Sequence, residues 1–130
     1  MHIEAFLETS AADVERLWRV NQLGPFLGMK AVARAMRGAG GGSIVNVASV
    51  DGLSSKNGIC AYAATKWGLR GLSRVAALEL GQMGIRVNVV CPEAGGPVMR
   101  RPYTPEAIDP STTLAFTHDV IPHNQKRSGI

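Results

Sequence analysis

A tyrosine and a lysine stand four residues apart in the segment Tyr62-Ala-Ala-Thr-Lys66. On a helix, this spacing places both side chains on one face. A free phenol is a poor base at neutral pH, and a neighbouring ammonium stabilises its phenolate form. The pair therefore has the chemistry of a general acid/base that exchanges a proton with a substrate oxygen.

Other polar residues accompany this pair at breaks or boundaries of the expected elements. Ser49 precedes Tyr62 by 13 residues, and Asn21 precedes Ser49 by 28. The segment Asn88–Pro92 begins 26 residues after the tyrosine. A Tyr-x-x-x-Lys pair by itself also arises by chance, so the companions are what point to a site. Among them, the Ser49 hydroxyl is suited to hold a substrate oxygen beside the phenol.

The first element expected to position these residues is a helix from Ala11 to about Arg37. Ser10 and Asp13 have the spacing of a capping box, with Asp in place of the usual Glu or Gln. Gly38 and the run Gly40–Gly42 end the helix. The residues at roughly helical spacing, and so expected on its apolar stripe, are Val14, Leu17, Trp18, Phe26, Leu27, Val32 and Met36.

A strand, a second long helix and another strand follow. Ser43–Ser49 is an apolar, β-branched run, typical of a parallel strand covered on both faces. A loop over residues 50–57 leads to a helix over 60–82, stopped by Gly84. Its expected stripe is Ala64, Leu72, Val75, Ala76 and Leu80. Ile85–Cys91 is the next strand, and Pro92 ends it.

Such a βαβ unit predicts two parallel, neighbouring strands joined by a right-handed crossover. Ligands of parallel sheets bind outside the carboxyl ends of the strands. Ser49, Tyr62 and Pro92 are all expected at that edge.

Four segments together resemble the short-chain dehydrogenase/reductase family, over roughly Thr9 to Pro92. They are Val20–Phe26, Gly42–Ser49, Ala61–Lys66 and Gly84–Pro92. The resemblance implies an α/β fold: a partial Rossmann-like, doubly wound parallel sheet with long flanking helices.

It also implies an oxidoreductase that interconverts a secondary alcohol and a ketone by hydride transfer, with NAD or NADP as cofactor. Tyr62 would be the general acid/base. Lys66 would assist it and bond the nicotinamide ribose, Ser49 would orient the carbonyl, and Asn21 would hold a relay water. The implied cofactor-binding residues are Tyr62, Lys66 and Pro92. The implied partners are a small-molecule alcohol or ketone and further copies of the chain, which would associate through helices 11–37 and 60–82.

Pro25 bears on the role of Asn21. Proline has no N–H, so the helical bond to the carbonyl of Asn21 cannot form, and that carbonyl is left to bind a water. The alternative is a simple proline kink with Asn21 merely exposed.

The sequence departs from the family at both sides of the matched region. The glycines at 38–42 follow a helix and precede a strand, the reverse of a phosphate-binding turn. Glu93 stands where the family has the glycine of its Pro-Gly turn. We therefore expect a single partial domain over 1–130, the catalytic half without the dinucleotide-binding segment, which binds NAD(P) negligibly by itself. Residues 93–130 are expected to be a poorly ordered substrate-side loop region, with a short helix near 112–120. A non-catalytic fragment or pseudoenzyme that retains the dimerisation helices is the alternative.

Composition and charge narrow the classes of protein to which the chain can belong. The chain has 130 residues, 45% hydrophobic and 18% charged, which is typical of one globular domain. Its net charge of +4 is dispersed, which argues against nucleic-acid binding. No apolar run is long enough for a membrane helix and no signal sequence is visible, so a cytoplasmic location is expected. The two cysteines and three histidines lack metal-ligand spacing. We expect no metal, two buried or idle thiols, and surface histidines.

Overall fold

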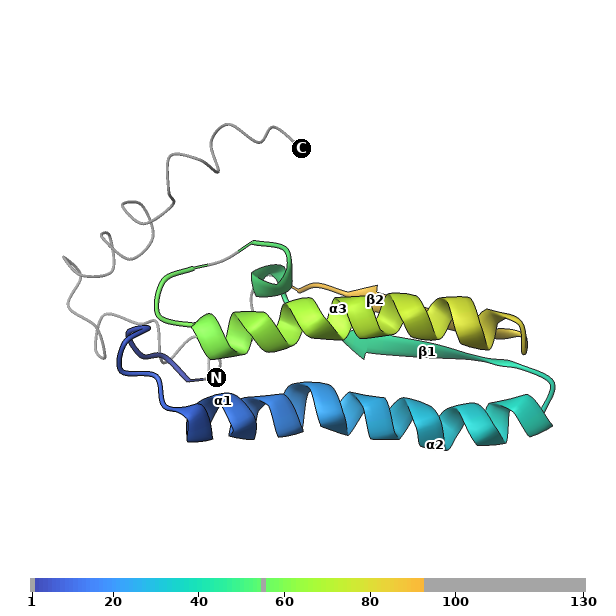
Figure 1. Ribbon diagram of the computed structural model, residues 1–130. Coiled ribbons are helices and arrows are strands. Elements are labelled where there is room, and N and C mark those ends of the chain that lie inside the picture. Colours follow the sequence, from blue (N-terminus) through green and yellow to red (C-terminus); the bar gives the residue numbers. More distant parts are fainter. Residues whose placement is uncertain (1, 55, 93–130) are drawn as a thin grey trace.

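The computed structural model describes residues 2–54 and 56–92 (Figure 1). Its elements are α1 (Ala11–Trp18), a π-helical turn (Arg19–Leu23), α2 (Gly24–Gly38), β1 (Gly42–Val47), a 3-10 turn (Val50–Gly52), α3 (Cys60–Gly81) and β2 (Ile85–Val90). The strands pair in parallel, from Gly42 opposite Ile85 to Val47 opposite Val90. The predicted α/β class and the parallel βαβ pairing are thus confirmed. The expectations for residues 93–130 lie outside the described residues.

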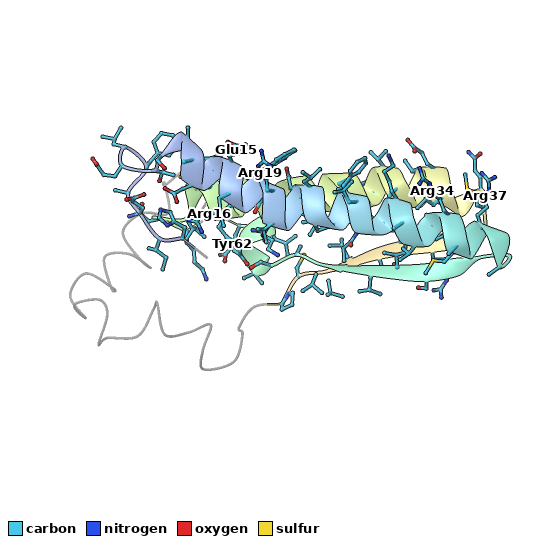
Figure 2. All side chains as sticks on the ribbon, turned by 90° about the horizontal axis from the view of Figure 1, so that it is seen from below. Glu15, Arg16, Arg19, Arg34, Arg37 and Tyr62 are labelled. Carbon is cyan, nitrogen blue, oxygen red and sulfur yellow. The ribbon has the colours of Figure 1, made fainter. Side chains whose placement is uncertain are left out.

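The described residues form two layers, with the helices on one side of the sheet (Figures 1 and 2). Side chains of β1 alternate, so Ile44 and Asn46 are buried against the helices while Val45 and Val47 are each 57% exposed. The expectation that this strand is covered on both faces is therefore wrong for the described part of the chain. None of the described elements packs on the face of the sheet that carries Val45 and Val47.

Two groups of buried residues fill the space between the layers. One joins Met29 and Ala33 of α2 to Ile44, Ile85 and Val87 of the sheet. The other surrounds the start of α3 and consists of Leu17, Ile59, Ala61, Tyr62 and Ala63. Between the layers, buried Asn46 donates a hydrogen bond to Ser73 Oγ at 2.9 Å and so links β1 to α3.

The predicted apolar stripes are partly wrong. Of the residues expected on the stripe of the helix over 11–37, Leu17 is buried. Five others are exposed, namely Val14, Trp18, Phe26, Leu27 and Val32. On α3, Ala64 and Val75 are also exposed, and the fully buried Leu69 was not predicted. These helices carry apolar side chains on the face away from the sheet as well, so hydrophobic spacing alone does not identify the buried face.

The helix expected over 11–37 is interrupted by the π-helical turn. The N–H of Gly24 donates to the carbonyl of Arg19, five residues back. Such a turn inserts one residue into the helix and shifts the phase of everything that follows. A continuous 3.6-residue period drawn through both α1 and α2 therefore assigns the wrong buried face to one of them.

The ends of the elements follow local chemistry. The side chain of Ser10 accepts a hydrogen bond from the N–H of Asp13, as the capping spacing predicts. Gly84 has a φ of 71°, the left-handed conformation that stops α3 and starts β2. Within the described ranges, no helix is both long enough and apolar enough to cross a membrane.

Candidate active site

Tyr62 and Lys66 lie on α3, one helical turn apart, where the helix passes the carboxyl end of β1. Lys66 Nζ lies 5.6 Å from the centre of the Tyr62 ring. The same ammonium donates a hydrogen bond to the carbonyl of Val47, the last residue of β1, at 3.1 Å. Burial lowers the pKa of Lys66, because the charged form loses part of its hydration.

Tyr62 itself is 9% exposed. Figure 2 shows it where the helix layer meets the strands, toward the end of the molecule opposite Arg34 and Arg37. Most of the phenol ring is thus enclosed by protein. A phenol and an ammonium held together at the carboxyl end of a strand can exchange a proton with a bound oxygen.

Ser49 begins the 3-10 turn just beyond β1. Its Oγ accepts a hydrogen bond from the N–H of Asp51 at 3.2 Å, and its hydroxyl donates to Asp51 Oδ2 at 3.3 Å. The next residue, Val50, donates its N–H to the carbonyl of Pro92 at 3.0 Å. This bond ties the Ser49 turn to the end of β2, so Ser49 and Pro92 lie at one edge of the sheet, as predicted.

Gly52 sets how closely this turn approaches α3. Its carbonyl accepts a hydrogen bond from Arg70 at 2.5 Å. A Cβ added to Gly52 would lie 2.9 Å from the carbonyl oxygen of Lys66, so only glycine fits against the helix backbone there. The turn that carries Ser49 and the helix turn that carries Lys66 are therefore in direct contact.

Asn21 joins the site through Thr65. Its Nδ2 donates to Thr65 Oγ1 at 3.1 Å, and Thr65 Oγ1 donates to the carbonyl of Tyr62 at 2.7 Å. Gln22 Nε2 donates to the carbonyl of Thr65 at 3.3 Å. The π-helical turn is thus anchored to the part of α3 that carries Tyr62.

The backbone around Asn21 is short of donors. Gly24 donates its N–H to Arg19 instead of to Val20, its α-helical partner. Pro25, the α-helical partner of Asn21, has no N–H. The carbonyls of Val20 and Asn21 therefore lose their regular donors, which leaves polar backbone atoms that a water can satisfy.

Two contributors to the site were not predicted from the sequence. Thr65 bridges Asn21 to Tyr62, and Asp51 contacts Ser49. Thr65 lies inside the Tyr-Ala-Ala-Thr-Lys segment, so its position was a usable signal. The signal for Asp51 was an acidic residue two positions after the expected strand-end serine.

His2 is not the isolated surface residue that we expected. Its Nε2 lies 2.8 Å from Glu4 Oε2 and 3.7 Å from Asp13 Oδ2. The Asp13 carboxylate also contacts Arg16, at 2.7 Å, and accepts from the Ser10 hydroxyl. His2, Glu4 and Asp13 therefore belong to one network of ion pairs and hydrogen bonds around the start of α1. Both Cys60 and Cys91 are free and partly buried.

Comparison with known proteins gives a family and several relatives. A family model described as short chain dehydrogenase matches residues 1–107. A 3-alpha-(or 20-beta)-hydroxysteroid dehydrogenase of Mycobacterium bovis is 41% identical over 92 residues, which are 71% of this chain and 35% of the relative. A trans-4-hydroxycyclohexanecarboxylate dehydrogenase of Sinomonas cyclohexanicum is 48% identical over 85 residues, 62% of this chain and 32% of the relative.

Among solved structures, a 4-hydroxyisoleucine dehydrogenase complexed with NADH and succinate superposes with a TM-score of 0.69. It is 35% identical, and the match covers 72% of this chain and 44% of that one. The chain spans about a third of the length of these curated relatives.

Proposed function

Because this chain belongs to the short-chain dehydrogenase family, we propose that it carries the catalytic residues of an NAD(P)-dependent oxidoreductase for secondary alcohols and ketones. The observation that carries this proposal is the placement of Lys66. Its ammonium lies over the Tyr62 ring and bonds the end of β1 at 3.1 Å, beside the turn of Ser49. This placement supports a site in which a phenol, an ammonium and a hydroxyl would act on one substrate oxygen at the edge where parallel sheets bind ligands.

The described residues fit the nicotinamide end of such a cofactor. Among them, the Lys66 ammonium donates one hydrogen bond, to Val47, and an ammonium has three N–H groups. Two remain for ribose hydroxyls. Tyr62 and Pro92, at the same edge, would complete the contacts. The nicotinamide, when bound, would accept or supply the hydride.

In alcohol oxidation, Tyr62 would take the proton of the substrate hydroxyl. In ketone reduction, it would return a proton to the carbonyl oxygen. Lys66 would stabilise the phenolate between these steps through its positive charge. Ser49 would hydrogen-bond the same substrate oxygen and so keep it beside the phenol.

Asn21 would take part in proton exchange between the site and solvent. With its carbonyl lacking a regular helical donor, Asn21 would hold a water near α3, and the Thr65 bridge would keep the two elements in register. Water held in this way would exchange protons between the site and solvent.

Because the chain alone is expected to bind NAD(P) negligibly, turnover of cyclohexanol with NAD⁺ or NADP⁺ in a longer version that includes a dinucleotide-binding segment tests the proposal. One relative is named for a hydroxycyclohexane substrate. Tyr62→Phe should lower turnover by about 100-fold to 10,000-fold, because it removes only the proton carrier. The affinity for NADH, measured by fluorescence titration, should stay within about twofold of wild type if the ring packing is kept. Undiminished turnover in Tyr62→Phe would refute the assignment.

A second candidate, a non-catalytic chain that retains the family's dimerisation helices, is favoured by one observation. The helices expose apolar side chains on the face away from the sheet, among them Val14, Trp18, Phe26, Trp67, Val75 and Leu78. We propose that copies of the chain associate through this face in either case. Titration of the 130-residue chain with NADH and NADPH tests cofactor binding by the chain alone: we expect negligible binding, and micromolar binding would overturn the expectation of a missing dinucleotide-binding segment and support the enzyme. Turnover by a longer version that includes such a segment separates the two functions, because the non-catalytic chain would stay inactive there.

A further inference from the structure

Arg70 is a partly buried arginine on α3, one helical turn beyond Lys66, for which the proposed mechanism has no role. Its Nη1 donates a hydrogen bond to the carbonyl of Gly52 at 2.5 Å. The carbon of its guanidinium lies 5.3 Å from the centre of the Trp67 ring. No carboxylate among the described residues forms an ion pair with it. The cation of Arg70 is therefore directed at a backbone carbonyl of the turn that follows Ser49.

The carbonyl of Gly52 depends on this donor. Gly52 is buried at the end of the 3-10 turn, and within the described ranges no backbone N–H donates to its carbonyl. The carbonyl of Val50, by contrast, accepts from the N–H groups of Leu53 and Ser54, at 2.8 Å and 2.9 Å. A buried carbonyl without a donor costs free energy comparable to a lost hydrogen bond. Removal of the Arg70 guanidinium should therefore loosen the turn.

Arg70 also supplies the polar connection between this turn and α3. Among the described residues, no other hydrogen bond joins residues 50–52 to that helix. The N–H of Gly52 donates to the carbonyl of Ser49 at 2.9 Å, so a displacement of Gly52 is passed on to Ser49. The phenol and the ammonium of the site are carried by α3 itself. A guanidinium that holds Gly52 therefore sets where the Ser49 hydroxyl lies relative to these two groups.

We propose that Arg70 is a positioning residue for Ser49, which it places by clamping the 3-10 turn against α3. The inference rests on the proposed function, because it takes Ser49 to hydrogen-bond the substrate oxygen. A planar guanidinium suits this role, since it can bond a carbonyl while its face lies near an aromatic ring, here that of Trp67. Displacement of a positioned group by about 1 Å can lower turnover by about 100-fold, so Arg70 can control the rate without contact with the substrate.

Hydrogen exchange of the 130-residue chain, followed by mass spectrometry, tests the clamp without cofactor or substrate. Arg70→Met keeps an unbranched side chain but removes the donor. We expect peptides that span residues 50–54 to exchange about 10-fold to 100-fold faster in this variant, the worth of one hydrogen bond to a charged group. Arg70→Lys, which keeps a donor, should restore part of the protection. Unchanged exchange in Arg70→Met would overturn the inference.

Arg74→Met is the matched control, because it removes the same charge from an exposed position one turn further along α3. It should leave the exchange of residues 50–54 at the wild-type rate. In Arg70→Met itself, peptides that span β2 should also keep their rate, because the loosening is local. Equally faster exchange over β2 would show that Arg70 supports the fold as a whole, and that result would overturn the inference.

A double-mutant cycle with Ser49→Ala separates positioning of Ser49 from a general effect on the site. In a longer version that includes a dinucleotide-binding segment, Arg70→Met should lower kcat for cyclohexanol by about 10-fold to 100-fold. The affinity for NADH should stay within about twofold of wild type. In the Ser49→Ala background, Arg70→Met should lower kcat by less than about twofold, because no hydroxyl is left to position.

The outcomes of this cycle distinguish the inference from the function on which it rests. Equal losses of kcat in the two backgrounds would overturn the inference alone and leave the proposed function standing. Absence of turnover in the longer version without any substitution would overturn both.

Discussion

Lys66 contacts three parts of the site with one side chain. Its ammonium bonds the end of β1 at Val47 and lies over the Tyr62 ring, and its backbone carbonyl packs against Gly52. Because the charged group is partly removed from water, its pKa lies below the value of 10.5 for a free lysine. The same burial that aims the ammonium at the phenol therefore imposes an electrostatic cost on the fold.

That cost predicts a pH dependence of stability. Above the lowered pKa, folded Lys66 loses its proton, while the unfolded chain keeps the proton up to about pH 10.5. The unfolded state binds more protons in this window, so the free energy of unfolding of wild type should rise with pH relative to Lys66→Met. Urea denaturation followed by circular dichroism from pH 7 to pH 10.5 would measure the difference.

Arg74→Met is the matched control, because it removes an exposed positive charge from the same helix. Arginine keeps its charge across this range, so the difference between Arg74→Met and wild type should not change with pH. A flat difference for Lys66→Met as well would contradict the burial of the ammonium.

At the scale of elements, the site depends on close contacts between segments that are distant in the sequence. The 3-10 turn of Val50–Gly52 packs on α3, and the π-helical turn of Arg19–Leu23 is bonded to α3 through Thr65. Both turns interrupt regular structure where a functional side chain is positioned. Irregular helical turns often occur at such places.

Gly52 and Gly71 provide a matched test of the first contact. In Gly52→Ala, the new Cβ would meet the backbone of Lys66 at 2.9 Å, and backbone atoms cannot move aside cheaply. We expect a loss of about 1–3 kcal/mol in the free energy of unfolding. Nothing lies within 4 Å of a Cβ at Gly71, in the exposed middle of α3, so Gly71→Ala should gain about 0.5–1 kcal/mol. Equal effects of the two changes in denaturant titrations would contradict this packing.

For the molecule as a whole, the main physical problem is apolar surface that the described residues leave exposed. Val45 and Val47 lie on the bare face of the sheet at 57% exposure each, and Leu78 of α3 is 77% exposed. Each of the two strands has a single pairing partner within the described ranges. Two strands with open edges are marginal in water and invite association.

The 130-residue chain should therefore self-associate, and sedimentation velocity over a range of concentrations would reveal it. If the outer face of the helices forms the contact, Val75→Glu should shift the distribution toward monomer, because the charge would have to be buried. Val47→Glu places the same charge on the bare sheet face and should leave that contact intact. A single monomeric species for wild type, with cooperative unfolding, would be the contrary result.

Much of the architecture could be predicted from the sequence because it follows from local periodicity and local capping. The strand, long helix and strand, their parallel pairing, the cap at Ser10 and the stop at Gly84 were all predicted correctly. The four-residue spacing of Tyr62 and Lys66 likewise predicted a shared helix face. Such features depend on neighbours within a few residues, so they can be read from the chain itself.

Only the tertiary structure could decide which face of each helix is buried, where the helical phase changes at Arg19–Leu23, and which side of β1 is exposed. The tertiary structure also decided the hydrogen bonds between Ser49 and Asp51, the Thr65 bridge to Asn21 and the absence of space beside Gly52. Each depends on where a distant segment packs. Apolar residues on both faces of a helix satisfy the same sequence pattern, and only contact with the sheet distinguishes them.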